Sequence, residues 1–201
     1  CSSDLGGKSR LLEATIQEHN SVGIPFIAAA GNSAGDNDRL PTYPACYDLP
    51  NILAVAATDS TDTLADFSNI GAKSVDLGAP GVEVISSVAD SDTSYASYSG
   101  TSMATPHVAG SVTLLRAQYP TKSMIDILAA ITGNTDPLPS LAGKCVTGGR
   151  LNVAKAMAAL GSGGGGGGGT SPGLPLNNSL AAAWSLSASL FSSTVELGAE
   201  C

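Results

Sequence analysis

A serine between a glycine turn and an apolar helical segment is the feature of this sequence best suited to chemistry. Ser102 follows Gly100, which allows a sharp backbone turn, and it precedes apolar residues that recur at helical spacing as far as Pro120. A helix N-terminus offers unpaired backbone N–H groups, which stabilise a negatively charged acyl intermediate. The pattern therefore predicts either a nucleophilic serine or an ordinary helix N-cap, a role that serine often fills.

The run around this serine has a family resemblance. Residues 100–110 read Gly-Thr-Ser-Met-Ala-Thr-Pro-His-Val-Ala-Gly and resemble, along their whole length, the active-site serine segment of the subtilisin-like serine proteases, the subtilases. The resemblance extends from about residue 5 to residue 160. It implies a serine endopeptidase that hydrolyses polypeptide substrates with Ser102 as its nucleophile. We expect no Gly-x-Ser-x-Gly nucleophile turn in this chain, which disfavours an esterase or lipase.

Acyl transfer also requires hydrogen-bond donors for the developing oxyanion. The segment Ala-Ala-Ala-Gly-Asn at residues 28–32 ends an apolar run in a turn, and it resembles the subtilase segment whose asparagine completes the oxyanion hole. The resemblance implies that Asn32 has this role together with the backbone N–H of Ser102. The alternative is an asparagine that only forms the turn after glycine.

The resemblance also implies a peptide-binding cleft with two walls. Glycines in such walls let a substrate backbone approach closely. The implied substrate-binding residues are Leu5, Gly6 and Gly7 in one wall, Ala30 and Gly31 in the opposite wall, and Thr42 near the floor of the specificity pocket. A threonine at the floor is larger than a glycine, so we expect a shallow pocket for small or apolar side chains.

The general base that a serine nucleophile needs is the part of the site that this sequence does not supply. His107 follows Ser102 by five residues on the predicted helix, so it points away from the hydroxyl. His19 lies near the end of an earlier predicted helix. In the subtilases the catalytic aspartate and histidine lie upstream of the Leu-Gly-Gly strand, so we expect this chain to lack both and to be nearly inactive alone.

Two hypotheses follow from a nucleophile without its base. In the first, the chain is the C-terminal part of a serine endopeptidase, and its partner is the missing N-terminal part of the same domain. In the second, it is a catalytically inactive pseudoprotease or truncated product that at most binds extended peptides. A start codon directly before Cys1 would favour the second hypothesis.

No cofactor is expected for this chemistry, but the resemblance includes a cation position. Asp76, with backbone carbonyls near Ala45 and Tyr47, matches residues that form a weak cation site in some subtilases. Oxygen ligands of this kind suit calcium. We therefore expect no catalytic metal and consider a structural calcium ion at Asp76.

The elements that would position these residues follow from hydrophobic patterning. Continuous apolar runs predict buried strands, and apolar residues at helical spacing predict helices. The predicted strands are residues 24–30, 51–57, 75–77 and 83–88, with a turn at 78–81, and the predicted helices are 102–119, 123–131, 152–160 and one that begins near Leu11 and fades at Asn20. Their alternation predicts an α/β fold, with a parallel sheet covered by helices on both faces, as in the subtilases but truncated on the N-terminal side.

Composition limits the classes of partner. The 201 residues are 43% hydrophobic and carry a net charge of −8, so the chain can bury a core and is unsuited to nucleic acid or an anionic membrane surface. No apolar run is long enough to span a bilayer. Cys46 and Cys145 are the one pair of cysteines within residues 5–160, where the family resemblance lies, as a disulfide or as free thiols.

Glycine content marks the end of the predicted domain. Residues 1–160 form the peptidase-like part, and seven consecutive glycines lie in a linker at 161–179. The low-complexity tail at 180–201 is expected to be disordered. The first residue is cysteine and no signal peptide is visible, so we expect a piece of a longer protein. The compartment stays unassigned, although the resemblance is compatible with a secreted or luminal location.

Overall fold

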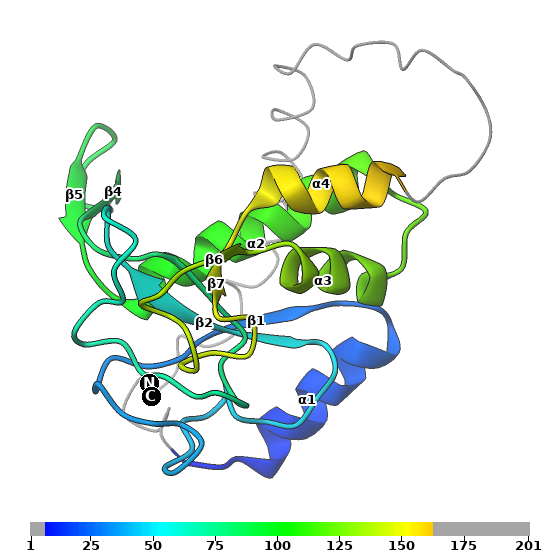
Figure 1. The fold of residues 1–201 in the computed structure, drawn as a ribbon, viewed down its shortest axis with the longest axis horizontal. Helices are drawn as coiled ribbons and strands as arrows, with labels where there is room; N and C mark the ends of the chain where they lie inside the picture. The colour runs from blue at the N-terminus through cyan, green and yellow to red at the C-terminus, as the bar shows by residue number, and fades with distance from the viewer. Residues whose placement is uncertain (1–6, 163–201) are drawn as a thin grey trace.

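The computed structural model describes residues 7–162, and a five-stranded sheet in the order β1-β2-β3-β7-β6 forms its centre (Figure 1). The strands are β1 (Phe26–Ala29), β2 (Ile52–Thr58), β3 (Leu77–Pro80), β6 (Asp136–Pro137) and β7 (Gly149–Arg150). β1, β2, β3 and β7 pair in parallel, and β6 runs antiparallel to β7. Every residue of β2 is buried, which explains its unbroken apolar sequence.

Helices cover both faces of this sheet, as the sequence predicts. The helices are α1 (Arg10–Ser21), α2 (Thr101–Gln118), α3 (Met124–Gly133) and α4 (Val153–Ser162). Alternate residues of β2 divide between the faces: Leu53 and Val55 pack in the core that contains α2, whereas Ala54 packs with Ile16 of α1. Figure 1 shows α1 on one side of the sheet and α2, α3 and α4 on the other. The fold is therefore α/β with a mostly parallel sheet.

In the segment after β2, one prediction is wrong and another is confirmed in part. Gly78 was expected in a turn, but it lies within β3 and pairs with Ala56. The expected strand at 83–88 is present as β4 (Val84–Ser87), yet it pairs antiparallel with β5 (Tyr95–Tyr98) in a separate two-stranded sheet. β4 and β5 project from the body of the molecule, where Ile85, Tyr95 and Tyr98 are exposed (Figure 1).

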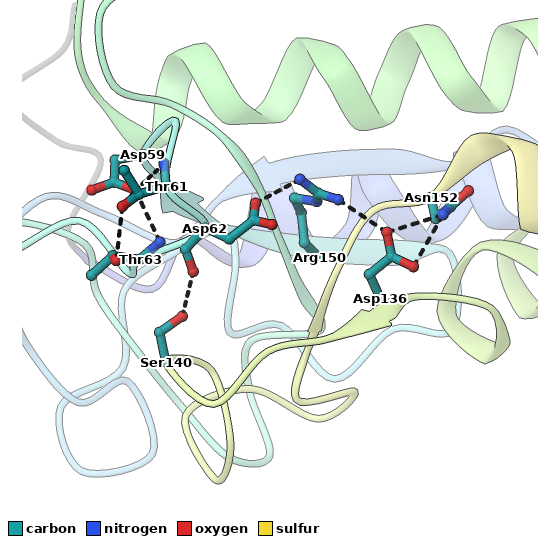
Figure 2. A network of polar contacts seen from close by, with 8 residues as sticks. All are labelled: Asp59, Thr61, Asp62, Thr63, Asp136, Ser140, Arg150 and Asn152. Carbon is teal, nitrogen blue, oxygen red and sulfur yellow. Dashed lines mark hydrogen bonds and ion pairs between the residues drawn. The ribbon is translucent and has the colours of Figure 1, made fainter.

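Charged side chains join the end of the sheet to its neighbouring loops (Figure 2). Arg150 of β7 pairs with Asp62 in the turn after β2 and with Asp136 of β6. Asp136 also accepts hydrogen bonds from Asn152 Nδ2 at 3.0 and 3.1 Å and pairs with Lys155 Nζ at 2.7 Å. These contacts lower the pKa of Asp136 to about 2, with the hydrogen bond from Lys155 as the largest cause. The ionised network therefore fastens β6 and β7 to the start of α4.

Several predictions concern residues outside this part of the chain. Leu5 and Gly6, most of the predicted linker at 161–179 and all of the predicted tail at 180–201 lie outside the described residues. Within the described part, Cys46 and Cys145 are both free thiols. None of the helices at residues 7–162 combines the length and the apolar character that crossing a membrane requires.

Candidate active site

Asn32 and Thr101 meet at the start of α2, although 69 residues separate them in the sequence. Asn32 Oδ1 accepts hydrogen bonds from the backbone N–H and the hydroxyl of Thr101, both at 2.8 Å. The Thr101 hydroxyl in turn accepts one from the backbone N–H of Gly31 at 3.2 Å. Thr101 is fully buried, so these bonds fix the loop after β1 against the first turn of α2.

Ser102 is the second residue of α2, and it is exposed. The N-cap position belongs to Gly100, which has no side chain to cap the helix, so the N-cap reading of Ser102 is wrong. Among the described residues, neither the hydroxyl nor the backbone N–H of Ser102 has a hydrogen-bond partner. A serine hydroxyl and a first-turn N–H donor are thus both available at a helix N-terminus, where the helix dipole favours negative charge.

The amide nitrogen of Asn32 lies beside this position. Because Thr101 engages Asn32 Oδ1, the Nδ2 group is directed the other way, and a Cβ atom built on Gly100 would lie 3.4 Å from it. Asn32 is exposed, and its Nδ2 donates no hydrogen bond to another described residue. The site therefore holds two unsatisfied donors next to a serine hydroxyl, which is the donor arrangement that an oxyanion requires.

Neither histidine is placed as a base for Ser102. The Nδ1 atom of His107 lies 2.9 Å from the carbonyl oxygen of Met103, so its ring is held against its own helix. His19 lies in the last turn of α1, on the opposite face of the sheet from α2. Among residues 7–162, no histidine or carboxylate contacts the Ser102 hydroxyl.

The predicted pocket residues fall into two groups. Ala30 is fully buried, and a Cβ atom on Gly31 would lie 3.5 Å from Thr42 Cγ2, so the predicted wall and floor adjoin one another. Thr42 is half-buried and its hydroxyl accepts a hydrogen bond from Asn69 Nδ2 at 3.3 Å. Gly7 is exposed, and a Cβ atom built on it would have no other described atom within 4 Å. The structure brings Ala30, Gly31 and Thr42 together and leaves Gly7 apart from them.

Contrary to the expectation from the sequence, a Gly-x-Ser-x-Gly pattern does occur, in the loop after β1 that carries Asn32. Residues 31–35 read Gly-Asn-Ser-Ala-Gly, which fits the Gly-x-Ser-x-Gly pattern of esterase nucleophiles. In that class the serine stands between a strand and a helix. Here the element that follows β1 is the strand β2 and not a helix, and the backbone N–H of Ser33 donates to Asn69 Oδ1 at 2.9 Å. The local structure therefore does not form an esterase nucleophile turn.

Asp76 borders a hollow on the side of the sheet that carries α1. The hollow is also lined by Ala45, Cys46, Tyr47 and Lys73. Asp76 Oδ2 accepts a hydrogen bond from the backbone N–H of Ala54 at 2.7 Å. Burial raises the pKa of Asp76, and this hydrogen bond opposes the rise. Asp76 is half-buried and offers oxygen ligands of the kind that calcium prefers, but Lys73 lines the same hollow, and no cluster of three acidic, histidine or cysteine side chains exists in the described part.

Comparison with known proteins places the chain among proteases. The model of the subtilase family matches residues 2–163. Thermitase from Thermoactinomyces vulgaris is 42% identical over 151 residues, which is 75% of this chain and 50% of that protein. Subtilisin DY from Bacillus licheniformis is 42% identical over 122 residues, covering 59% of this chain and 43% of that protein. The chain thus spans about half the length of the curated relatives it matches.

Solved structures agree with this comparison. The self-cleaved protease domain of PatA matches with a TM-score of 0.66 and 30% identity, covering 80% of this chain and 59% of that one. The prenylagaramide maturation protease PagA matches with a TM-score of 0.66 and 28% identity, covering 79% of this chain and 58% of that one. In both matches, this chain covers somewhat more than half of the length of the solved structure.

Proposed function

The chain belongs to the subtilase family, and from this premise we propose that it carries the nucleophile half of a serine endopeptidase active site. Ser102 is the nucleophile, and the oxyanion hole consists of the backbone N–H of Ser102 and Asn32 Nδ2. The observation that carries the proposal is the contact between Asn32 Oδ1 and Thr101, because it leaves the Asn32 amide N–H groups unpaired beside Ser102. The base and its orienting carboxylate come from a part of the domain upstream of these residues.

The chemical step assigns each group one task. Ser102 Oγ attacks the carbonyl carbon of the scissile peptide bond, and its proton passes to the upstream base. The carbonyl oxygen becomes an oxyanion that accepts hydrogen bonds from the two donors, which are fixed before the reaction and need no reorganisation. The intermediate then expels the amine, which takes the proton from the base, and leaves an acyl group on Ser102 that water removes.

The pocket beside this centre receives the substrate side chain. Ala30 and Gly31 form one wall, and Thr42 narrows the floor. Gly31 adjoins Thr42, which supports a shallow pocket for a small or apolar side chain. Leu5, Gly6 and Gly7 complete the cleft by pairing with the substrate backbone in the whole enzyme.

The partner of this chain is the upstream part of its own domain. Thermitase and subtilisin DY extend over about twice the matched length, which supports such a part. Within the described residues, β1 pairs with β2 alone and leaves one edge of the sheet open. The exposed apolar residues Ile85 and Tyr95 of the β4–β5 hairpin are further surface that this part covers.

A calcium ion at Asp76 is part of the same proposal. Asp76 and the backbone carbonyls near Ala45 and Tyr47 would hold this ion. Burial raises the free-energy cost of ionising the Asp76 carboxylate, and the positive charge of the ion would offset that cost. We assign this ion a structural role, because it would lie on the face of the sheet that α1 covers, whereas α2, which carries Ser102, covers the other face.

Hydrolysis by the whole protein tests the proposal. The chain is expressed with its native upstream coding sequence and assayed on a varied peptide library, alongside Ser102→Ala and Asn32→Ala. We expect cleavage by the unmodified protein, none by Ser102→Ala, and a kcat lower by about 10²–10³-fold for Asn32→Ala, the size known for loss of one oxyanion donor in subtilisin. Cleavage that survives Ser102→Ala, or a whole protein that cleaves no peptide, would contradict the proposal and leave the inactive, peptide-binding alternative.

A further inference from the structure

We propose that Asn69 is a positioning residue that holds the oxyanion loop, so that Asn32 Nδ2 stays aimed at the substrate position. The inference rests on the proposed role of Asn32. Asn69 lies in the segment between β2 and β3 and has an exposed fraction of only 3%. It touches neither Ser102 nor the substrate position, so it acts through the backbone on either side of Asn32.

The side chain of Asn69 binds the loop on both sides of Asn32. Before Asn32, Asn69 Nδ2 donates to the carbonyl oxygen of Ala30 at 3.1 Å, and the backbone N–H of Asn69 donates to that of Gly31 at 2.8 Å. After Asn32, Asn69 Oδ1 accepts from the backbone N–H groups of Ser33 at 2.9 Å and Gly35 at 3.0 Å. One buried residue therefore fixes the backbone immediately preceding and following the oxyanion donor.

The orientation of the Asn69 amide is itself determined. Its Nδ2 group faces three acceptors: the Ala30 carbonyl, Asn37 Oδ1 at 3.0 Å and the Thr42 hydroxyl at 3.3 Å. Its Oδ1 faces two N–H donors, so a flipped amide would set donor against donor. Asn37, itself 2% exposed, adds a second hydrogen bond to the Ala30 carbonyl at 2.9 Å. We call the hydrogen bonds between Asn69 and the loop around Asn32 the Asn69 clamp. The amide of Asn69 has one orientation in which its oxygen and its nitrogen both find hydrogen-bond partners.

Gly31 shows how closely the Asn69 side chain packs against the loop. A Cβ atom at position 31 would lie 2.5 Å from Asn69 Nδ2, closer than real contacts allow, and Gly31 has a φ of +114°. The residue directly before Asn32 must be a glycine because Asn69 occupies the space of a side chain there. The geometry of the oxyanion loop and the presence of Asn69 are thus mutually dependent.

Together, two contacts fix Asn32 from different directions. Thr101 holds the tip of its side chain from α2, and Asn69 holds its backbone from the β2–β3 segment. A donor that moves by about 1 Å can cost 10²-fold in rate, although it changes ground-state binding little. Loss of the Asn69 clamp should therefore lower kcat much more than it changes KM.

The first test measures amide exchange of Ser33 and Gly35 in the 201-residue chain by NMR. Ser33 is exposed, so its amide exchanges quickly unless Asn69 protects it. We expect both amides in the unmodified chain to exchange about tenfold or more slowly than unprotected amides, and Asn69→Ala or the milder Asn69→Ser to abolish this protection and shift the Asn32 side-chain amide signals. Fast exchange in the unmodified chain would overturn the inference, whether or not the variants fold.

The second test compares kinetics of the whole enzyme, with Asn51→Ala as the matched control. Asn51 is a fully buried asparagine whose Nδ2 donates to two backbone carbonyls away from the site, those of Ile16 and Ile24. We expect Asn69→Ala to lower kcat by about 10- to 10²-fold with a much smaller change in KM, and Asn51→Ala to leave kcat near the unmodified value at a comparable loss of stability. Equal losses of kcat in both variants would overturn the positioning role.

The two proposals fail in different ways. If Ser102→Ala leaves hydrolysis intact, the proposed function fails while the exchange measurement still tests the clamp. If Ser102→Ala abolishes hydrolysis and the Ser33 and Gly35 amides are unprotected, the function stands and the role of Asn69 falls.

Discussion

Asn32 and Thr101 are joined by two hydrogen bonds of 2.8 Å that end on the same oxygen, Asn32 Oδ1. Thr101 is the residue before Ser102, so the contact sets the distance between the donor side chain and the nucleophile. It also assigns the two ends of the Asn32 amide: the oxygen faces the protein and the nitrogen faces the site. The orientation of the Asn32 amide, for which we propose a role as oxyanion donor, is thus fixed at the start of α2 and does not depend on a bound substrate.

Removal of the Thr101 hydroxyl tests this relationship. Thr101→Val keeps the side-chain volume but removes the donor to Asn32 Oδ1 and the acceptor for the Gly31 N–H. Because the N–H of the half-buried Gly31 is left unpaired, we expect a loss of about 1 kcal/mol in the free energy of unfolding, measured by urea denaturation. Thr101→Ser retains the hydroxyl and should lose much less, so equal losses in the two variants would show that the hydrogen bonds are not responsible.

The Asp136 network predicts an acid-sensitive tie between β6, β7 and α4. Lys155, Asn152 and Arg150 lower the pKa of Asp136 from 3.8 to about 2. The folded state therefore binds this proton less readily than the unfolded chain, so the stabilisation is present above pH 4 and is lost as the pH falls toward 2. Asp136→Asn should lower the thermal midpoint at pH 7 and flatten its fall between pH 4 and pH 2.

A matched aspartate separates this effect from general acid unfolding. Asp66 is exposed, and its side chain has no hydrogen-bond partner among the described residues. Asp66→Asn should leave both the midpoint at pH 7 and the acid-dependent fall close to those of the unmodified protein. If both variants flatten the fall equally, the network around Arg150 is not its source.

The pKa of Asp76 is shifted in the opposite direction from that of Asp136, so its effect on stability depends on pH in the opposite way. Burial raises the pKa of Asp76, so its ionised form costs stability, and that cost grows as the pH rises above about 4. Calcium bound at Asp76 would offset this cost. We expect calcium at ten times its dissociation constant to stabilise the protein at pH 7 by about 1.4 kcal/mol, visible as a higher thermal midpoint. Asp76→Asn should show no such rise, and an equal rise in both proteins would place the ion elsewhere.

The sequence predicted the elements whose signal is local. The apolar run at 51–57 corresponds to β2 (Ile52–Thr58), and the predicted helix at 102–119 corresponds to α2 (Thr101–Gln118). Both are long enough for burial to impose a clear pattern on the residues. β6 and β7 have two residues each, too few for such a pattern, and were not predicted.

The features that the sequence did not predict depend on contacts between distant segments. Gly78 suggested a turn, but it lies in β3, and a glycine is needed there because Leu141 Cδ1 comes within 2.7 Å of the position that a Cβ atom would take. Asn69 follows a phenylalanine and a serine in an unremarkable loop, and only the fold reveals that it faces Ser33, 36 residues earlier. The family resemblance could point to Ser102 and Asn32, whereas the residue that holds Asn32 in place required the structure.

The most direct test of the account is covalent labelling of Ser102. The whole protein, with its upstream part, is treated with a fluorophosphonate probe, which reacts with an activated serine nucleophile, and the labelled peptide is identified by mass spectrometry. We expect one labelled residue, Ser102, with labelling abolished in Ser102→Ala. We also expect no labelling of the 201-residue chain alone, because we propose that the base lies in the upstream part. Labelling at Ser33, or no labelling of the whole protein at Ser102, would contradict it.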